Sequence, residues 1–144
     1  MAKELHLRVV TPDRTVVDRP VASVTFRGID GSYGILPHHA PLLTGIARSG
    51  TVEINEVDGK HSSMFASDGF AQMQGNVLTL VCEAGELAEE IDLERVKAAE
   101  AKAREKLAHL DRASEEFLKA ELSLKKALAR ELLARKTSGT GSLR

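Results

Sequence analysis

The sequence predicts an α+β protein, mainly β and then α, with an N-terminal antiparallel β-sandwich followed by a C-terminal two-helix antiparallel hairpin. Three observations support this fold class. Up to residue 90, apolar residues alternate with polar ones in short runs, which is the period of a β-strand. Turn residues separate these runs at close intervals. From Ile91 onward proline is absent, the first glycine is Gly139, and helix-forming residues dominate.

The alternating runs predict strands over residues 5–9, 22–26, 52–54, 63–65 and 77–81. Turns are expected at residues 11–12, 30–31, 49–50, 58–59, 67–69 and 75–76. Many short strands joined by tight turns are typical of a sandwich or a flattened barrel. Pro37 and Pro41 remove backbone donors, so residues 34–43 must bulge or run along an edge.

Asp92 lies where the N-cap of the first helix belongs. The apolar face of that helix is predicted to comprise Leu93, Val96, Ala99, Ala103, Leu107 and Leu110. After a break at residues 109–114, the face of a second helix is predicted to comprise Phe117, Leu118, Leu122, Leu124, Leu128 and Leu132. The predicted domains are therefore a β-sandwich over residues 1–90, a helical hairpin over 91–136 and a flexible tail over 137–144.

Composition excludes several classes of protein. With 144 residues, 42% of them hydrophobic, the chain is long enough for one domain with a substantial core or for one domain that carries an appendage, but not for two full domains. A formal net charge of -1 gives no sign of a nucleic-acid surface. Cys82 is the single cysteine and no export signal or apolar membrane span is recognisable. We therefore expect a reducing compartment and no direct membrane insertion.

No catalytic residue and no metal site is predicted. The adjacent His38 and His39 point to opposite faces of an extended chain and cannot easily chelate one ion. Neither a nucleophile elbow nor a phosphate-binding P-loop is present, and Cys82 is expected to be a buried, inert thiol. Two interpretations of the apolar, proline-pinned segment remain open. It is either a docking surface for another protein, or a loop that folds over the core and buries Leu42 and Leu43.

Three stretches carry a resemblance that covers nearly the whole chain: DGSYGILPHHAPLLTGI, LVCEAGELAEEIDLERVKAAEAKA and AELSLKKALAREL. They resemble the epsilon subunit of the bacterial rotary F-type ATP synthase. The resemblance implies a non-catalytic subunit of the central rotor stalk that couples proton translocation to ATP synthesis. It also implies docking on the gamma subunit and the c-subunit ring, peripherally, at the cytoplasmic face of the bacterial plasma membrane.

The resemblance assigns individual residues as well. Ser32 and Tyr33 match the loop that faces the c ring, and His39 matches a histidine near the gamma contact. The family usually has glycine at the position of His38, which leaves the local backbone conformation open because a residue with a Cβ tolerates positive φ poorly.

The family's helical hairpin lies folded against the sandwich in one state. In the other it extends into the catalytic alpha and beta subunits and inhibits ATP hydrolysis. By resemblance, Lys125, Lys126, Arg130 and Arg135 would then face an acidic segment of the beta subunits. The alternative is a solvated face on which these residues form pairs along their own helix.

The resemblance also implies ATP as a regulatory ligand of the folded state, with no cofactor required. The family motif I/L-D-x-x-R-A reads IDLERV here, so Asp92 and Arg95 match, as do Glu86 and Arg130. Lys126 replaces an arginine and Val96 an alanine, which is expected to weaken binding. In the alternative, Asp92 only caps its helix and Arg95 only pairs on the surface.

Two competing functions are a stand-alone nucleotide-binding sensor outside any rotor and a small hydrolase with His38 or His39 as its base, for which no nucleophile is found.

Overall fold

The computed structural model describes residues 3–142, with side chains described as far as Arg135. The chain forms two compact units, Met1–Leu87 and Ala88–Arg144. The first unit contains the strands and the second contains the helices, so the division lies close to the expected boundary at residue 90 but before it.

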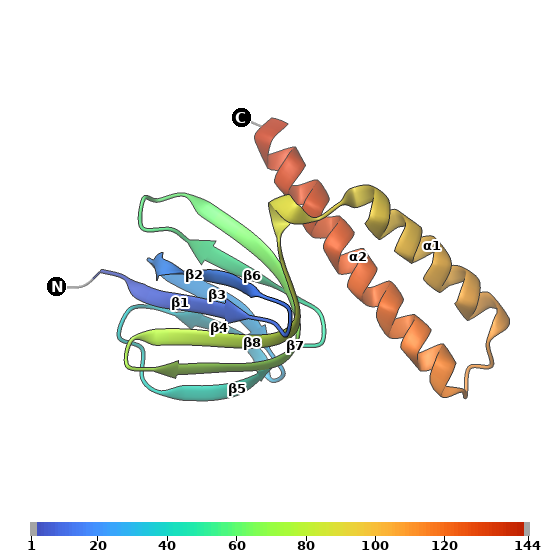
Figure 1. Cartoon of the computed structure of the whole chain (residues 1–144), viewed down its shortest axis with the longest axis horizontal. Coiled ribbons are helices and arrows are strands. Elements are labelled where there is room, and N and C mark those ends of the chain that lie inside the picture. The colour runs from blue at the N-terminus through green and yellow to red at the C-terminus, as the bar shows by residue number, and fades with distance from the viewer. Residues whose placement is uncertain (1–2, 143–144) are drawn as a thin grey trace. The chain divides into compact units, whose positions relative to one another are not determined.

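The first unit is a β-sandwich of eight strands, which confirms the predicted fold class (Figure 1). The strands are β1 (Leu5–Val10), β2 (Thr15–Val21), β3 (Ser23–Gly28), β4 (Gly31–Ile35), β5 (Leu42–Ile46), β6 (Gly50–Asn55), β7 (His61–Gln74) and β8 (Val77–Leu87). Their order is β2-β1-β8-β7-β5-β3-β4, with β6 pairing both β3 and β7. The pairing is antiparallel throughout this set, except that β1 runs parallel to β8.

The prediction of a turn at residues 67–69 was wrong. These residues lie inside β7, which pairs with β8 from Met64↔Leu87 to Gln74↔Val77. Before the Ser-Asp-Gly sequence β7 pairs with β6, and after it β7 pairs with β5. Asp68 has a φ of 49° there, so the sequence bends the strand where its neighbour changes instead of reversing the chain.

Strands β2, β4 and β5 lie outside the runs that alternation marked. Pro20 interrupts the pattern in β2, and the strand tolerates it because β2 lies at one edge of the sheet order. Strand β4 lies at the other edge, and a loop with Pro37 and Pro41 connects it to β5. That arrangement agrees with the expectation that this segment bulges or follows an edge.

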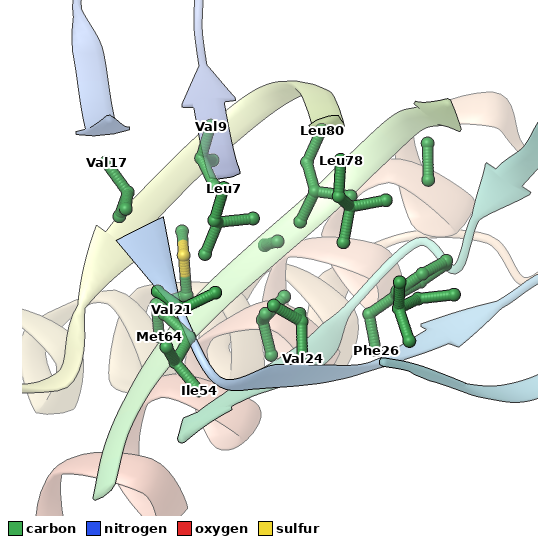
Figure 2. Close-up of a cluster of buried hydrophobic side chains, with 14 of the residues drawn as sticks. Leu7, Val9, Val17, Val21, Val24, Phe26, Ile54, Met64, Leu78 and Leu80 are labelled. Atoms are coloured by element: carbon green, nitrogen blue, oxygen red, sulfur yellow. The ribbon is translucent and has the colours of Figure 1, made fainter. Parts of the chain in front are cut away.

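Inward-facing side chains of these strands form one hydrophobic core (Figure 2). Leu7 and Val9 of β1 lie beside Leu78 and Leu80 of the neighbouring β8 on the inner face, as their alternation predicts. The core positions the functional surface because it fixes the strands whose outer faces and connecting loops carry it.

The second unit contains the short helix η1 (Ala88–Glu90) and the long helices α1 (Leu93–His109) and α2 (Glu115–Ser142), which form an antiparallel hairpin (Figure 1). The predicted N-cap is confirmed, because Asp92 Oδ1 accepts hydrogen bonds from the backbone N–H groups of Glu94 at 3.0 Å and Arg95 at 3.4 Å. Ser114 caps α2, since its hydroxyl accepts from Phe117 N at 3.1 Å.

Helix α2 extends beyond the predicted limit at Lys136. Its backbone continues to Ser142, so most of the predicted tail, 137–144, is helical and the last two residues lie outside the described part of the chain. No proline stops the helix, and adding a residue to an existing helix is much easier than starting one.

Alanines predominate among the buried residues of the two helices. On α1 the buried positions are Val96, Glu100 and Ala103. On α2 alanines are buried at a spacing of seven residues, at Ala120, Ala127 and Ala134, and Leu133 is buried beside them. The predicted leucine face of α2 was therefore wrong in part, because Leu118, Leu128 and Leu132 are exposed. Alanine lets two helix backbones approach closely, and that approach turns the larger leucines outward.

Candidate functional site

The loop between β4 and β5 is held in a defined turn. His39 N donates to Leu36 O at 3.1 Å, Pro37 occupies the second position, and His38 occupies the third with a φ of 63°. Proline at the second position and positive φ at the third are typical of a type II turn. The chain thus adopts the backbone that glycine would favour, although the residue is histidine.

Asn76 anchors this turn to the rest of the sandwich. Its Oδ1 accepts from His38 N at 2.7 Å, and its Nδ2 donates to Glu4 O at 3.1 Å. Since Asn76 lies in the turn between β7 and β8, one side chain joins three separate parts of the chain. The loop therefore presents a fixed surface.

The residues predicted to dock occupy the β4 edge and this loop. Ser32 lies exposed on β4. The neighbouring Tyr33 ring stacks on Phe26 with centroids 5.4 Å apart, and its hydroxyl donates to the Asp30 carboxylate at 2.9 and 3.0 Å. Tyr33 is thus half-buried and supports the strand, whereas Ser32 and His39 are free to touch a partner.

An exposed apolar group accompanies these residues, and sequence analysis missed it. Ile29 is 74% exposed, Leu43 71% and Phe70 45%. Phe70 lies opposite Gly45 across the β5–β7 pair, and Ile29 N bonds to Gly45 O at 3.1 Å, so Gly45 lies between the two side chains. Leu43 follows on the same face of β5. We call Ile29, Leu43 and Phe70 the docking patch.

Alternation along β5 and β7 could have revealed this patch. Leu42 packs against the core while Leu43 is 71% exposed, so the alternative interpretation, in which both leucines are buried, holds only for Leu42. In β7, Ala71 and Met73 are buried, which turns Phe70 outward together with Gln72 and Gln74. A large apolar residue on an otherwise polar outer face indicates a surface that another molecule covers.

The predicted ATP-binding residues come from a strand of the first unit and from both helices of the second. Glu86 belongs to β8, while Asp92 and Arg95 flank the start of α1. Lys126 and Arg130 lie one turn apart on α2 and are partly buried. A cleft of about 670 Å³ between α1 and α2 is lined instead by residues nearer the hairpin tip, among them Ala99, Lys102, Ala103, Lys119 and Ala120.

Two of the cationic residues of α2 have partners on their own helix. Lys125 Nζ lies 3.6 Å from Glu121, and Arg135 Nε donates to Glu131 Oε1 at 2.8 Å, both at i,i+4 spacing. The Lys125–Glu121 pair is exposed, and such a pair contributes only about 0.3–0.5 kcal/mol, so an acidic partner could displace it at little cost. In the other pair the Glu131 side chain is only 20% exposed.

Nothing in the described part of the chain resembles a metal or nucleophile site. No three His, Cys, Asp or Glu side chains gather there in a group able to hold a metal ion. Burial raises the pKa of Cys82 to about 11, so this thiol stays protonated and unreactive at neutral pH. Across residues 3–142, neither helix has an apolar stretch sufficient to cross a membrane.

Comparisons with known proteins agree with this architecture. Residues 4–88 match the family model "ATP synthase, Delta/Epsilon chain, beta-sandwich domain", and residues 89–130 match the model of the long α-helix domain. An ATP synthase epsilon chain of Caldanaerobacter subterraneus is 38% identical over 94% of this chain and 97% of its own length. Another, from Nitratidesulfovibrio vulgaris, is 36% identical over 90% of this chain and 95% of its own length.

A solved structure shows the same fold within an assembly. A chain in the Euglena gracilis mitochondrial ATP synthase, OSCP/F1/c-ring, has a TM-score of 0.76 and 25% identity, with 92% of this chain and 82% of that chain covered. These matches disfavour both a stand-alone nucleotide sensor and a hydrolase, because they extend over the sandwich and the helices together. The chain belongs to the ATP synthase delta/epsilon family, as an epsilon subunit with a regulatory and coupling role instead of a catalytic one.

Proposed function

We propose that this epsilon subunit docks on the gamma subunit and the c-subunit ring of its ATP synthase through the docking patch together with Ser32 and His39. The observation that carries the proposal is the exposure of Leu43 and Phe70 on a sheet face that is otherwise polar. Apolar side chains in a rigid sheet gain free energy when a partner covers them. Docking of this kind would couple proton translocation to ATP synthesis at the cytoplasmic face of the plasma membrane.

The test compares two exposed apolar positions of the sandwich, a leucine and a valine. Leu43→Gln removes an apolar side chain from the docking patch, and Val57→Gln makes the matched change at another exposed apolar position of the sandwich. Full burial of such a side chain contributes about 1.5–3 kcal/mol, so Leu43→Gln is expected to weaken binding to a gamma–c-ring complex about 10- to 150-fold. Binding that is unchanged by Leu43→Gln, or weakened equally by both variants, would contradict the proposal.

The helical hairpin is the inhibitory element in this proposal. Two observations support it: alanines predominate among the buried residues of the helices, and Leu118, Leu128 and Leu132 remain exposed on α2. When α2 extends toward the catalytic alpha and beta subunits, Lys125, Lys126, Arg130 and Arg135 would exchange their present contacts for acidic partners.

Deletion of residues 92–144 tests the inhibitory part separately. A complex assembled with the truncated chain is expected to hydrolyse ATP faster than one assembled with the full chain. The control is that the complex contains a stoichiometric amount of the truncated subunit. If the two complexes then hydrolyse ATP at equal rates, inhibition by the helices is refuted, and the docking proposal is unaffected.

ATP is proposed as a regulatory ligand of the hairpin. Support comes from Asp92 and Arg95 at the start of α1 and from the i,i+4 spacing of Lys126 and Arg130 on α2. Calorimetric titration of the full chain with ATP is expected to give saturable binding that Arg130→Gln weakens and that the control Lys125→Gln leaves unchanged. Absence of binding, or equal effects of the two variants, would argue against ATP at this position.

A further inference from the structure

Glu100 occupies an unusual place in the helical hairpin. It lies in the α1 seam between Val96 and Ala103, and it is the single charged residue classed as buried among the side chains that the structure describes. An isolated carboxylate at a buried seam position is unfavourable, so it needs either a partner or a proton. An apolar residue would be expected there on periodicity alone.

The partner of Glu100 is another carboxyl group. Its side chain hydrogen-bonds to that of Glu131, which projects from α2. Two carboxylates are acceptors only, so a hydrogen bond between them requires one proton. Glu131 also accepts from Arg135 Nε at 2.8 Å, which favours the ionised form of Glu131 and leaves the proton on Glu100.

We propose that Glu100 and Glu131 form a proton-dependent latch between α1 and α2. In the closed hairpin, protonated Glu100 donates to the Glu131 carboxylate. When the helices separate, the hydrogen bond breaks and both side chains become solvated, so at a pH between its ordinary and its raised pKa Glu100 releases its proton to water. In that pH range closing takes up a proton, and opening releases one.

The electrostatic surroundings agree with this assignment. The hydrogen bond to Glu131 is the main cause that raises the pKa of Glu100 above its ordinary 4.5, followed by burial and by the charge of Glu131. Arg104 and Arg135 act in the opposite direction. The hydrogen bonds from Glu100 and Arg135 lower the pKa of Glu131, with help from the charge of Lys97 and against the effect of burial.

The sign of the pH dependence follows from linkage. Because the pKa of Glu100 is raised in the closed hairpin, its contribution to closure is full below 4.5 and is lost as the pH rises through the raised pKa. The ionised form of Glu131 also favours closure. Its contribution is present above 4.5 and is lost as the pH falls through its lowered pKa. Closure is therefore most favourable between the two pKa values and weaker at neutral pH.

The latch acts on the same hairpin that the proposed function makes inhibitory, and only its effect on ATP hydrolysis rests on that function. Acidification around the subunit would favour the closed hairpin and so withdraw the inhibitory helices. At higher pH the doubly ionised pair would favour separation.

Two measurements on the full-length isolated chain test the latch. The first is carbon-13 NMR titration of the glutamate side-chain carboxyl groups, in which Glu100 is expected to titrate above 4.5. The second is amide hydrogen exchange along α1, which reports the opening equilibrium even when the open form is rare. If the pKa of Glu100 is one pH unit higher in the closed hairpin than in the open one, the opening constant can rise by up to about tenfold from acid to neutral pH.

Variants separate the latch from a general effect of charge. In Glu100→Gln the amide donates to Glu131 without a titratable proton, so α1 is expected to stay protected equally at pH 5 and pH 7.5. The control Glu105→Gln removes the same charge from an exposed position of α1 and is expected to keep the pH dependence of the unmodified chain. Glu131→Gln is expected to return the pKa of Glu100 toward its ordinary value.

Specific outcomes overturn the latch. It is wrong if Glu100 titrates at or below 4.5, if opening of the unmodified chain is independent of pH, or if Glu100→Gln retains the full pH dependence. None of these measurements involves ATP hydrolysis or a partner subunit. Failure of the latch and failure of the proposed inhibition are therefore detected by different experiments.

Discussion

Replacement of His38 by glycine tests how much strain the loop between β4 and β5 carries. His38 has a φ of 63°, in the left-handed region, and its side chain is exposed. The hydrogen bond that holds it runs from its backbone N to Asn76 Oδ1 at 2.7 Å. Glycine keeps this hydrogen bond and removes the Cβ that disfavours the conformation.

The expected gain combines two opposed effects. A non-glycine residue in the left-handed region costs about 1–2 kcal/mol. Glycine also has more freedom in the unfolded chain, which costs about 0.4–1 kcal/mol. The difference predicts that His38→Gly stabilises the sandwich by about 0.5–1 kcal/mol. For a unit of this size that corresponds to a rise in melting temperature of about 2–8 °C.

Tyrosine fluorescence measures the change in melting temperature of the β-sandwich and not of the helices. Tyr33 is the single tyrosine and the chain has no tryptophan, so emission reports the sandwich during thermal unfolding. Asn76→Gly is the matched comparison, because Asn76 has a φ of 61° but its side chain makes two hydrogen bonds. Asn76→Gly is expected to destabilise by about 1–2 kcal/mol. The reasoning fails if His38→Gly lowers the melting temperature or if both glycines shift it in the same direction.

Three further outcomes are expected. Gly69→Ala should abolish cooperative unfolding of the sandwich, because a Cβ would lie 1.8 Å from Val81 O, whereas Gly34→Ala, with nothing within 4 Å, should retain the transition. Glu56→Gln should cost about 1.5–3 kcal/mol in urea unfolding at pH 7, because Glu56 accepts from Arg19 at 2.9 and 2.7 Å. Arg19 is the main cause that lowers the pKa of Glu56, so the contribution is lost as the pH falls through that lowered pKa, and the two proteins should converge in acid; a constant difference would contradict this. Cys82, whose pKa burial raises to about 11, should react with a thiol reagent at pH 8 only after unfolding in urea.

Local patterns predicted the sandwich but not the full length of β7. When one face of a sheet is buried, every second residue of a strand is apolar. The buried core residues of β1, β3 and β8 follow this pattern. The sequence Ser67-Asp68-Gly69 has turn composition, yet the chain continues through it because β8 supplies partners on both sides of the bend. Gly69 is required there by the close approach of Val81 O, and that contact between distant residues is invisible to a local pattern.

Sequence analysis named candidate docking residues but did not predict the docking patch. The prolines identified the loop as rigid, and the family resemblance assigned Ser32, Tyr33 and His39 to it. The apolar patch escaped because Ile29, Leu43 and Phe70 come from three separate segments, which only the β5–β7 register and the Ile29–Gly45 contact bring together. Tyr33, which the resemblance assigned to the loop that faces the c ring, stacks on Phe26 and donates to Asp30, so part of its side chain is engaged within the sandwich.

The helical unit shows why counting hydrophobic residues misjudged α2. Leucines dominate its apolar content, but alanines occupy most of its described buried positions, with Leu133 the exception, and burying a methyl group contributes only about 0.8 kcal/mol where a leucine contributes about 1.5–3 kcal/mol. The closed hairpin thus leaves Leu118, Leu128 and Leu132 exposed, the last of them by 71%. A small free energy of closure lets one proton at Glu100 shift the balance, and exposed leucines let an outside partner compete for α2. Both properties follow from the same choice of alanine at the seam, and they support a hairpin that opens over one that is locked shut.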